Sequence, residues 1–280
     1  MPEIPDNIEG YQERHEIVNI GPNKLLMTIR TGITDDIIYM GGEEIYCIYA
    51  LVPKYVDTDP NEQIEIGTFQ ELKYDVSCGL GDSLAEGVDA KLIVKTLITY
   101  IARTYPYVKE LRFSDASYKI CDNGRKTELS EMSYITIGKT WYEKHFGAYV
   151  EPDPTSSYNR DMEYVKQKKQ ATTWENLLKR IPMLRQFEDM RGLYENASTW
   201  QEFFSAIQKR LGGVAQFCIF ASSWLNKFMS QYLRVRFTKY TYIMPVKDYG
   251  LKFTIGPYSS GGSKRRSTRR RRRRSQRAKH

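Results

Sequence analysis

The strongest chemical signal in this 280-residue chain is a basic segment near its C-terminus. Residues 264–280 contain eleven lysines and arginines, six of them consecutive arginines, and no acidic residue. Because like charges this close together repel one another, we expect the segment to stay disordered until it meets an anionic partner. The residues expected to make that contact are Lys264, Arg265, Arg266, Arg269, Arg270, Arg271, Arg272, Arg273, Arg274 and Arg277.

Several anionic partners fit such a segment. If six to eight of its arginines met DNA phosphates, binding would weaken with salt at a log–log slope of about −5 to −7. No aromatic residue interrupts the segment for base stacking, so it would recognise charge and not base sequence. We expect nucleic acid or another polyanion as the partner. A nuclear-localisation signal, a contact with acidic protein or lipid surfaces and a charge-solubilised end are the other interpretations.

The remainder of the chain has the opposite charge balance. Subtracting the eleven cationic residues of the tail from the formal net charge of +8 leaves −3. The high isoelectric point therefore belongs to the tail and does not indicate a basic folded surface.

A second candidate site is the loop that precedes residue 91. Residues 64–76 are rich in β-branched and aromatic side chains, and the turn-rich sequence SCGLGDSLAEG follows. Residues 91–105 carry apolar side chains at helical spacing, and residues 108–113 alternate as in a strand. This order predicts two parallel strands joined by a crossover helix. The free N–H groups at the start of such a helix form a natural anion site.

The same order of elements, followed by WYEKHFGA at residues 141–148, resembles the GNAT superfamily of acetyl-CoA-dependent N-acyltransferases. Residues 113–148, FSDASYKICDNGRKTELSEMSYITIGKTWYEKHFGA, are more closely similar to an uncharacterised protein family of nucleocytoplasmic large DNA viruses. The ending of glycines followed by polyarginine is also typical of proteins from such viruses. The resemblance covers residues 72–150, and it implies possible virion proteins as partners and a location in the host cytoplasm, the host nucleus or the virion.

The resemblance also implies roles for individual residues. Tyr142 matches the general-acid tyrosine, which protonates the departing thiolate of coenzyme A. Glu65 and Glu71 lie on the strand that often carries the general base in this superfamily. The residues implied for cofactor binding are Gly79, Gly81, Gly87 and Lys91. The alternative for Tyr142 is that it packs in the core with Trp141 and Phe146.

The glycine loop departs from the superfamily pattern [QR]-x-x-G-x-[GA], because Val76 stands where glutamine or arginine belongs. Asp82, Glu86 and Asp89 also make this loop negative. Two like charges about 6 Å apart cost roughly 0.7 to 3 kcal/mol, which opposes a bound diphosphate. We therefore expect a non-catalytic interaction protein without a cofactor. The alternative is a working N-acyltransferase that uses acetyl-CoA.

The spacing of the cysteines and histidines does not match that of a metal-binding site. The four cysteines show no CxxC spacing and the three histidines are far apart, so we expect no metal site, no disulfide framework and a reducing compartment. The opening MPEIPDNIEG has neither the basic start nor the apolar run of a signal peptide, so secretion is not expected. Residues 214–229 are too short and too polar for a membrane span, so we expect a soluble protein.

The expected fold class is α/β (α+β), with a GNAT-like mixed sheet and crossover helices. We expect this domain over residues 1–152, a helical region with returning strands over 153–257, and a disordered tail over 258–280. Early strands are predicted at 15–21, 24–31 and 43–56, and one helix over 129–146. In the helical region, TTWENLLKRI and STWQEFFSAI each open with a threonine cap. Asp115 and Ser117, just after a strand, are interpreted as a turn.

Overall fold

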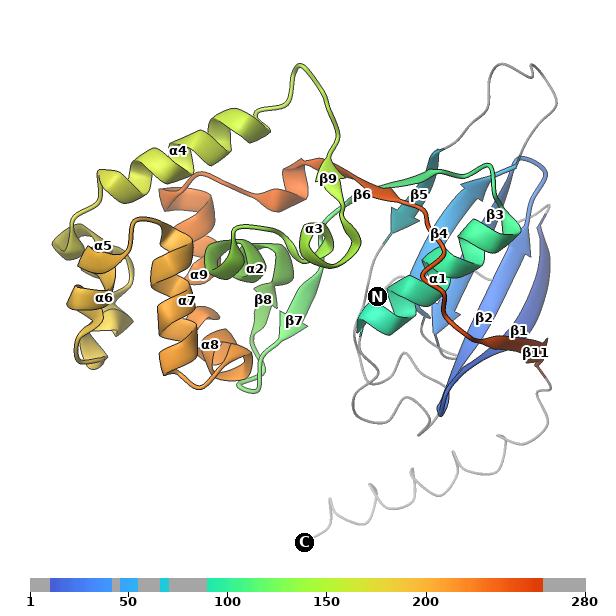
Figure 1. The fold of residues 1–280 in the computed structure, drawn as a ribbon, viewed down its shortest axis with the longest axis horizontal. Helices are drawn as coiled ribbons and strands as arrows, with labels where there is room; N and C mark the ends of the chain where they lie inside the picture. Colours follow the sequence, from blue (N-terminus) through green and yellow to red (C-terminus); the bar gives the residue numbers. More distant parts are fainter. Residues whose placement is uncertain (1–10, 42–45, 55–65, 71–89, 259–280) are drawn as a thin grey trace, which may run out of the picture.

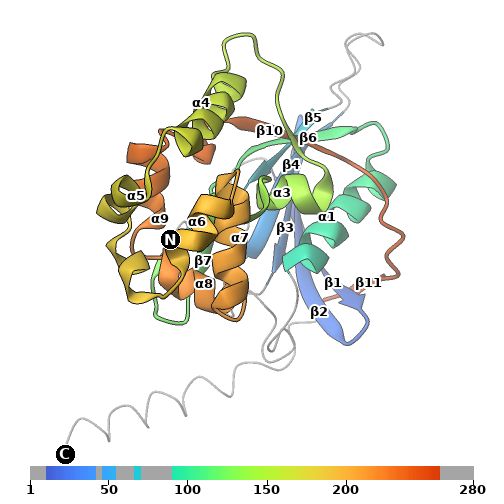
Figure 2. The ribbon, with the colours of Figure 1, turned by 60° about the vertical axis from the view of Figure 1, so that its left-hand side comes forward.

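The computed structural model describes residues 11–41, 46–54, 66–70 and 90–258. Its architecture is mixed α+β, which confirms the fold class in this coarse form. A nine-stranded sheet forms one side of the molecule, and most of the helices gather beside it (Figure 1). Helix α1 (Ala90–Thr104) crosses one face of the sheet in both views (Figure 2).

The large sheet has the strand order β11-β1-β2-β3-β4-β5-β6-β10-β9. Among its described pairings, only that of β5 with β6 is parallel. Its strands are β1 (Gln12–Ile20), β2 (Asn23–Thr31), β3 (Asp35–Gly41), β4 (Tyr46–Pro53), β5 (Ile66–Gln70), β6 (Glu110–Ser114), β9 (Tyr149–Val150), β10 (Thr241–Pro245) and β11 (Thr254–Pro257). A separate antiparallel hairpin pairs β7 (Tyr118–Ile120) with β8 (Lys126–Glu128).

The helices after α1 are short. They are α2 (Leu129–Ile137), α3 (Trp141–Phe146), α4 (Tyr158–Gln170), α5 (Trp174–Arg180), α6 (Met190–Asn196), α7 (Trp200–Arg210), α8 (Val214–Ala221) and α9 (Leu225–Lys227). Single turns of 3-10 or π-helix lie at η3 (Pro182–Gln186), η4 (Phe228–Tyr232) and η5 (Phe237–Lys239).

The predicted strand, helix and parallel strand are present as β5, α1 and β6, with Ile66 paired to Glu110. Helix α1 buries Ile93, Leu97 and Ile101 completely or nearly so, as its apolar spacing predicts. Gly67 is closely packed, because an added Cβ would lie 2.8 Å from Leu111 Cδ2 and 3.0 Å from the Leu51 carbonyl oxygen. This close packing joins the parallel pair to the core that α1 covers.

The prediction of one helix over residues 129–146 is wrong, because the chain turns at Gly138 and forms α2 and α3 instead. Gly138 has φ of +82° and its N–H donates to the Tyr134 carbonyl at 2.8 Å, a conformation that favours glycine. Thr140 then starts α3 with a capping box, in which Glu143 Oε2 accepts from the Thr140 N–H at 2.6 Å. The aromatic residues of α3 therefore do not continue the helix formed by α2.

The helical region begins as expected and then returns to the sheet. Thr173 caps α5, and Thr199 forms a capping box at the start of α7. Strand β10 lies between β6 and β9, while β11 pairs with β1 at the far edge. Residues 153–257 therefore contribute two strands to the sheet of the preceding residues, and the division at residue 152 stays a prediction.

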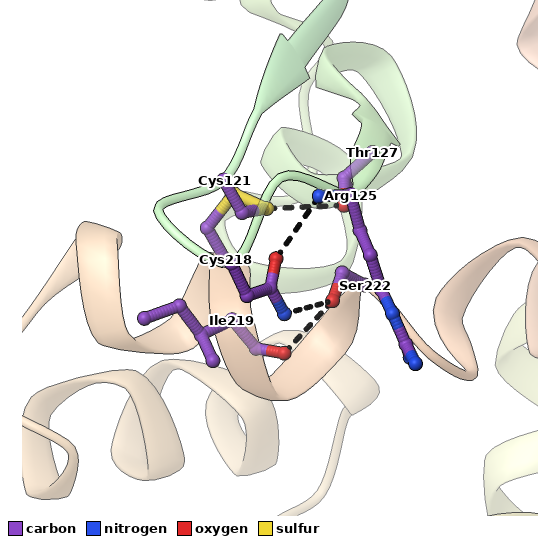
Figure 3. Close-up of a disulfide and its surroundings, with 7 residues drawn as sticks. Cys121, Arg125, Thr127, Cys218, Ile219 and Ser222 are labelled. Carbon is purple, nitrogen blue, oxygen red and sulfur yellow. Dashed lines mark hydrogen bonds between the residues drawn. A yellow bond between two sulfur atoms is a disulfide. The ribbon is translucent and has the colours of Figure 1, made fainter. Parts of the chain in front are cut away.

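The cysteine prediction is wrong, because Cys121 and Cys218 form a disulfide across 97 residues of sequence (Figure 3). Cys47 is disulfide-bonded as well. The Cys121–Cys218 bond ties the turn between β7 and β8 to α8, and the Asn123 side-chain amide donates to Ser222 Oγ at 3.1 Å beside it. Sequence spacing could not show this pairing, because only the folded hairpin brings the two residues together. The inference of a reducing compartment loses its support.

Within the described residues, no helix has the length and apolar character needed to cross a bilayer. In the same part of the chain, no group of three histidine, cysteine, aspartate or glutamate side chains is placed to hold a metal ion.

Candidate functional site

A cavity opens beside the first turn of α1, and we call it the lysine pocket. Its volume is about 640 Å³. Walls from α1, β7, α2, α3, α7 and α8 surround it. Its cationic and aromatic lining residues are Lys91, Lys119, Lys144, His145, Tyr118 and Trp141, and its most exposed apolar ones are Ile120, Ile137 and Val214.

Helix starts and turns that are encoded in the local sequence position the residues that line the lysine pocket. Helix α1 begins at Ala90 with no acidic residue in its first turn, so Lys91 stands at the N-terminal end of its dipole. The turn at Gly138 and the cap at Thr140 set the direction of α3, which brings Trp141 and Lys144 to the pocket. The His145 ring packs on Trp141, with ring centroids 5.3 Å apart.

The charged residues that the structure describes around this pocket are all basic. Lys91, Lys119 and Lys144 line it, and none of the described residues that line it is acidic. A unit negative charge 4 Å from one ammonium group gains about 4 kcal/mol at an effective dielectric of 20. The lysines, together with the start of α1, therefore favour an anionic group in the pocket.

The walls of the pocket also expose apolar surface. Ile120, Ile137 and Val214 are 50%, 45% and 51% exposed, and they are three of the six large apolar side chains in the described residues with high exposure. Exposed apolar side chains gathered in one cavity are typical of a binding site. The pocket therefore suits an anion that also carries an apolar or aromatic group.

Of the residues implied for cofactor binding, Lys91 lies in this pocket. Gly79, Gly81 and Gly87, the acidic residues of their loop and the glutamates Glu65 and Glu71 lie outside the described residues, as does the arginine-rich tail. Their roles stay predictions. Sequence analysis did not single out Lys119 or Lys144 for binding, since only the fold brings them next to Lys91.

Tyr142 is placed in the core and not on the pocket wall. Its side chain is 1% exposed, and its ring lies 4.6 Å from that of Phe113 and 4.9 Å from that of Trp141. Burial raises the pKa of the Tyr142 phenol well above its usual value, and the nearby Asp115 carboxylate raises it further. These contacts agree with the core-packing alternative, and the general-acid role stays a prediction.

Asp115 and Ser117 form the expected turn after β6, in which Ser117 Oγ donates to Asp115 Oδ1 at 2.5 Å. Asp115 is 1% exposed, and burial raises its pKa to about 6 against the opposing hydrogen bonds from Ser117. The Tyr242 hydroxyl and Asp115 Oδ2 have no hydrogen-bond partner among the described residues. The turn is thus part of a buried polar cluster.

Comparison with known proteins gives no match to a protein-family model, a curated protein or a solved structure. The class that the fold and the site define is therefore a mixed α+β protein with a cationic, partly apolar pocket at the start of its crossover helix.

Proposed function

We propose that this is a non-catalytic interaction protein of a large DNA virus, which binds nucleic acid or another polyanion. The lysine pocket would bind one phosphate-bearing unit of the ligand, and the arginine-rich tail would add attraction that does not depend on sequence. The observation that carries the proposal is the set of three lysines around a pocket without an acidic side chain among its described lining residues.

The apolar part of the pocket supports a single-stranded ligand in particular. An unpaired base can stack on an aromatic ring or lie on apolar surface while its phosphates meet lysines. Trp141 and the exposed Ile120 and Ile137 would supply that surface. A duplex keeps its bases stacked on one another, so it would use the tail more than the pocket.

The test is the affinity of the full chain for a short single-stranded DNA, measured by fluorescence anisotropy at several salt concentrations. Replacing both Lys119 and Lys144 by glutamine should lower the affinity about tenfold and reduce the log–log salt slope by about 1.4, since single strands give roughly 0.7 per contact. The matched control replaces the exposed Lys166 and Lys179 by glutamine and has the same change in net charge. Equal affinities for the two variants would reject the pocket as the contact.

The tail is tested in the same assay by replacing Arg269 to Arg274 with serine in the full chain. If all six arginines contact phosphates, the slope should fall by about 4. An unchanged slope would reject the tail as the nucleic-acid contact.

The alternative is an acetyl-CoA-dependent N-acyltransferase with a GNAT-like core and Tyr142 as general acid. It is supported by the position of the lysine pocket at the first turn of α1, the helix that joins the parallel strands β5 and β6. Acetyl-CoA at a hundred times its dissociation constant should stabilise the protein by about 2.7 kcal/mol, visible as a higher thermal midpoint. Stabilisation together with acetyl transfer that Tyr142→Phe abolishes would establish the enzyme. No stabilisation at millimolar acetyl-CoA would reject it.

A further inference from the structure

A second cavity, which we call the carboxylate pocket, lies between the junction of β8 with α2 and the helices α8 and α9. Its volume is about 360 Å³, and it is lined by Glu128, Glu131 and Asn226 together with apolar side chains that include Leu225. It shares only Tyr118 with the described lining of the lysine pocket. The proposed function does not use this cavity.

The unusual group in the carboxylate pocket is Glu131. Its side chain is fully buried, and apart from a proton shared with the neighbouring Glu128 carboxyl group, neither carboxylate oxygen has a hydrogen-bond partner among the described residues. An ionised carboxylate in such a place is costly unless a proton or a cation compensates it. Native proteins rarely leave a buried polar group unsatisfied, so this one needs an explanation.

Helix capping does not explain it. Glu131 is the third residue of α2, and in α3 and α7 the glutamates at the same position, Glu143 and Glu202, close capping boxes. In α2 the cap residue Glu128 forms no side-chain capping bond. Glu131 is instead one of the residues that line the carboxylate pocket.

The neighbouring groups pair Glu131 with a second carboxyl group. Burial, the negative charge of Glu128 and a side-chain hydrogen bond with Glu128 together raise the pKa of Glu131 to about 8, and Arg236 opposes them. Glu128 Oε1 accepts from the Asn226 side-chain amide at 3.2 Å. Lys126 also lines the pocket, but its ammonium group lies 4.3 Å from the centre of the Tyr118 ring. Two carboxyl groups this close favour a proton or a cation between them.

We propose that the carboxylate pocket binds a small organic cation whose N–H groups donate to Glu131 and Glu128. The apolar lining, which includes Ala116, Ala221 and Leu225, suits the alkyl part of such a ligand. A bare metal ion fits less well, because no group of three metal-ligating side chains lies here or elsewhere in the described residues.

The test uses the full chain with two probes, n-butylammonium and methylguanidinium, and the neutral isostere 1-butanol. Binding is followed by methyl NMR shifts at pH 9, where Glu131 is ionised and both probes remain cationic. We expect saturable binding of at least one cation, with shifts at the β8–α2 junction and in α9, and at least tenfold weaker binding of 1-butanol. The two cations separate ammonium from guanidinium recognition. Binding of 1-butanol as strong as that of the cations, or no saturable binding by either cation, would overturn the proposal.

Variants assign the site. Glu131→Gln should weaken cation binding at least tenfold, and the exposed Glu163→Gln on α4 should change it less than twofold. If Glu131→Gln does not fold, Ala116→Leu serves instead, since Ala116 is exposed at the pocket and a larger side chain would fill it. Cation binding retained in the folded variant that is tested would place the ligand elsewhere and reject this site.

Discussion

The lysine pocket and the carboxylate pocket lie against the same hairpin, β7–β8, and share Tyr118, yet their charged residues have opposite character. The lysine pocket has three lysines and exposed apolar walls. The carboxylate pocket has a fully buried carboxyl group, Glu131, beside a second one, Glu128, and its only described lysine is Lys126. The comparison shows that one short hairpin can border two pockets of different charge, because different helices complete each of them.

The two pockets also differ in how their walls are held. Opposite walls of the carboxylate pocket belong to the β7–β8 hairpin and to α8 with α9, which the Cys121–Cys218 disulfide ties together. The lysine pocket depends in addition on α1 and α3, whose positions follow from helix packing and capping. We therefore expect the two sites to respond differently to the same perturbations.

The largest expected effect comes from the disulfide. Replacing Cys121 and Cys218 by serine should lower the free energy of unfolding by about 2–5 kcal/mol, because the bond closes a loop of 97 residues. Urea unfolding measures this change. Organic-cation binding should weaken more than anion binding in the same variant. Equal weakening of both would show that the disulfide does not distinguish the pockets.

The next effect concerns pH. Glu131 has a pKa raised to about 8 from a usual 4.5, so the folded protein binds more protons than the unfolded chain between these values. Its contribution to stability should therefore fall with rising pH by about 1.4 kcal/mol per unit across this window. Asp115, with a pKa of about 6, acts in the same direction at lower pH. In Glu131→Gln, the decline in unfolding free energy should largely stop above pH 6. An unchanged decline between pH 6 and 8 would contradict the assignment.

A smaller effect is expected from charge removal in the lysine pocket. Replacing Lys119 and Lys144 by glutamine should cost about 1.4 kcal/mol of anion binding, equivalent to a tenfold change in affinity. Because neither residue lines the carboxylate pocket, organic-cation binding should change less than twofold. A loss of both activities would show that the pockets are coupled through the hairpin.

The smallest effect should come from the shared residue. Tyr118→Leu removes a ring that lies under the Lys126 ammonium, a contact worth about 0.5–1 kcal/mol at such sites. We expect a loss of stability of that size by thermal unfolding. If the Tyr118 ring forms part of both pockets, Tyr118→Leu should also change the affinity for the anion and the affinity for the organic cation. A change in only one of these affinities would show that the ring contributes to that pocket alone.

Periodicity and capping motifs predicted part of the fold. The strand, helix and strand around α1 and the threonine caps of α5 and α7 follow from neighbouring residues, and the structure confirms them. Strand β3 was not predicted, although Ile38 and Met40 face the core while Ile37 and Tyr39 belong to a separate apolar cluster. A strand that is apolar on both faces lacks the alternation that identifies one in sequence.

The candidate sites were less predictable than the elements. Lys91 was singled out because it stands beside a helix start, but Lys119 and Lys144 join it only through the hairpin and the turn at Gly138. Glu131 gave no signal, because a glutamate at the third position of a helix usually caps it. Its burial depends on α8 and α9, which lie about ninety residues further along the chain.

The sequence by itself determined the helix periods, the caps and the positive charge of the tail, since each depends on residues that are close together in the chain. The tertiary structure decided the Cys121–Cys218 disulfide, the burial of Tyr142 and the gathering of Lys91, Lys119 and Lys144 in one pocket and of Glu128 and Glu131 in another. The physical reason is that pairing, burial and electrostatic surroundings depend on distances in space, which the chain sets only when distant segments pack together.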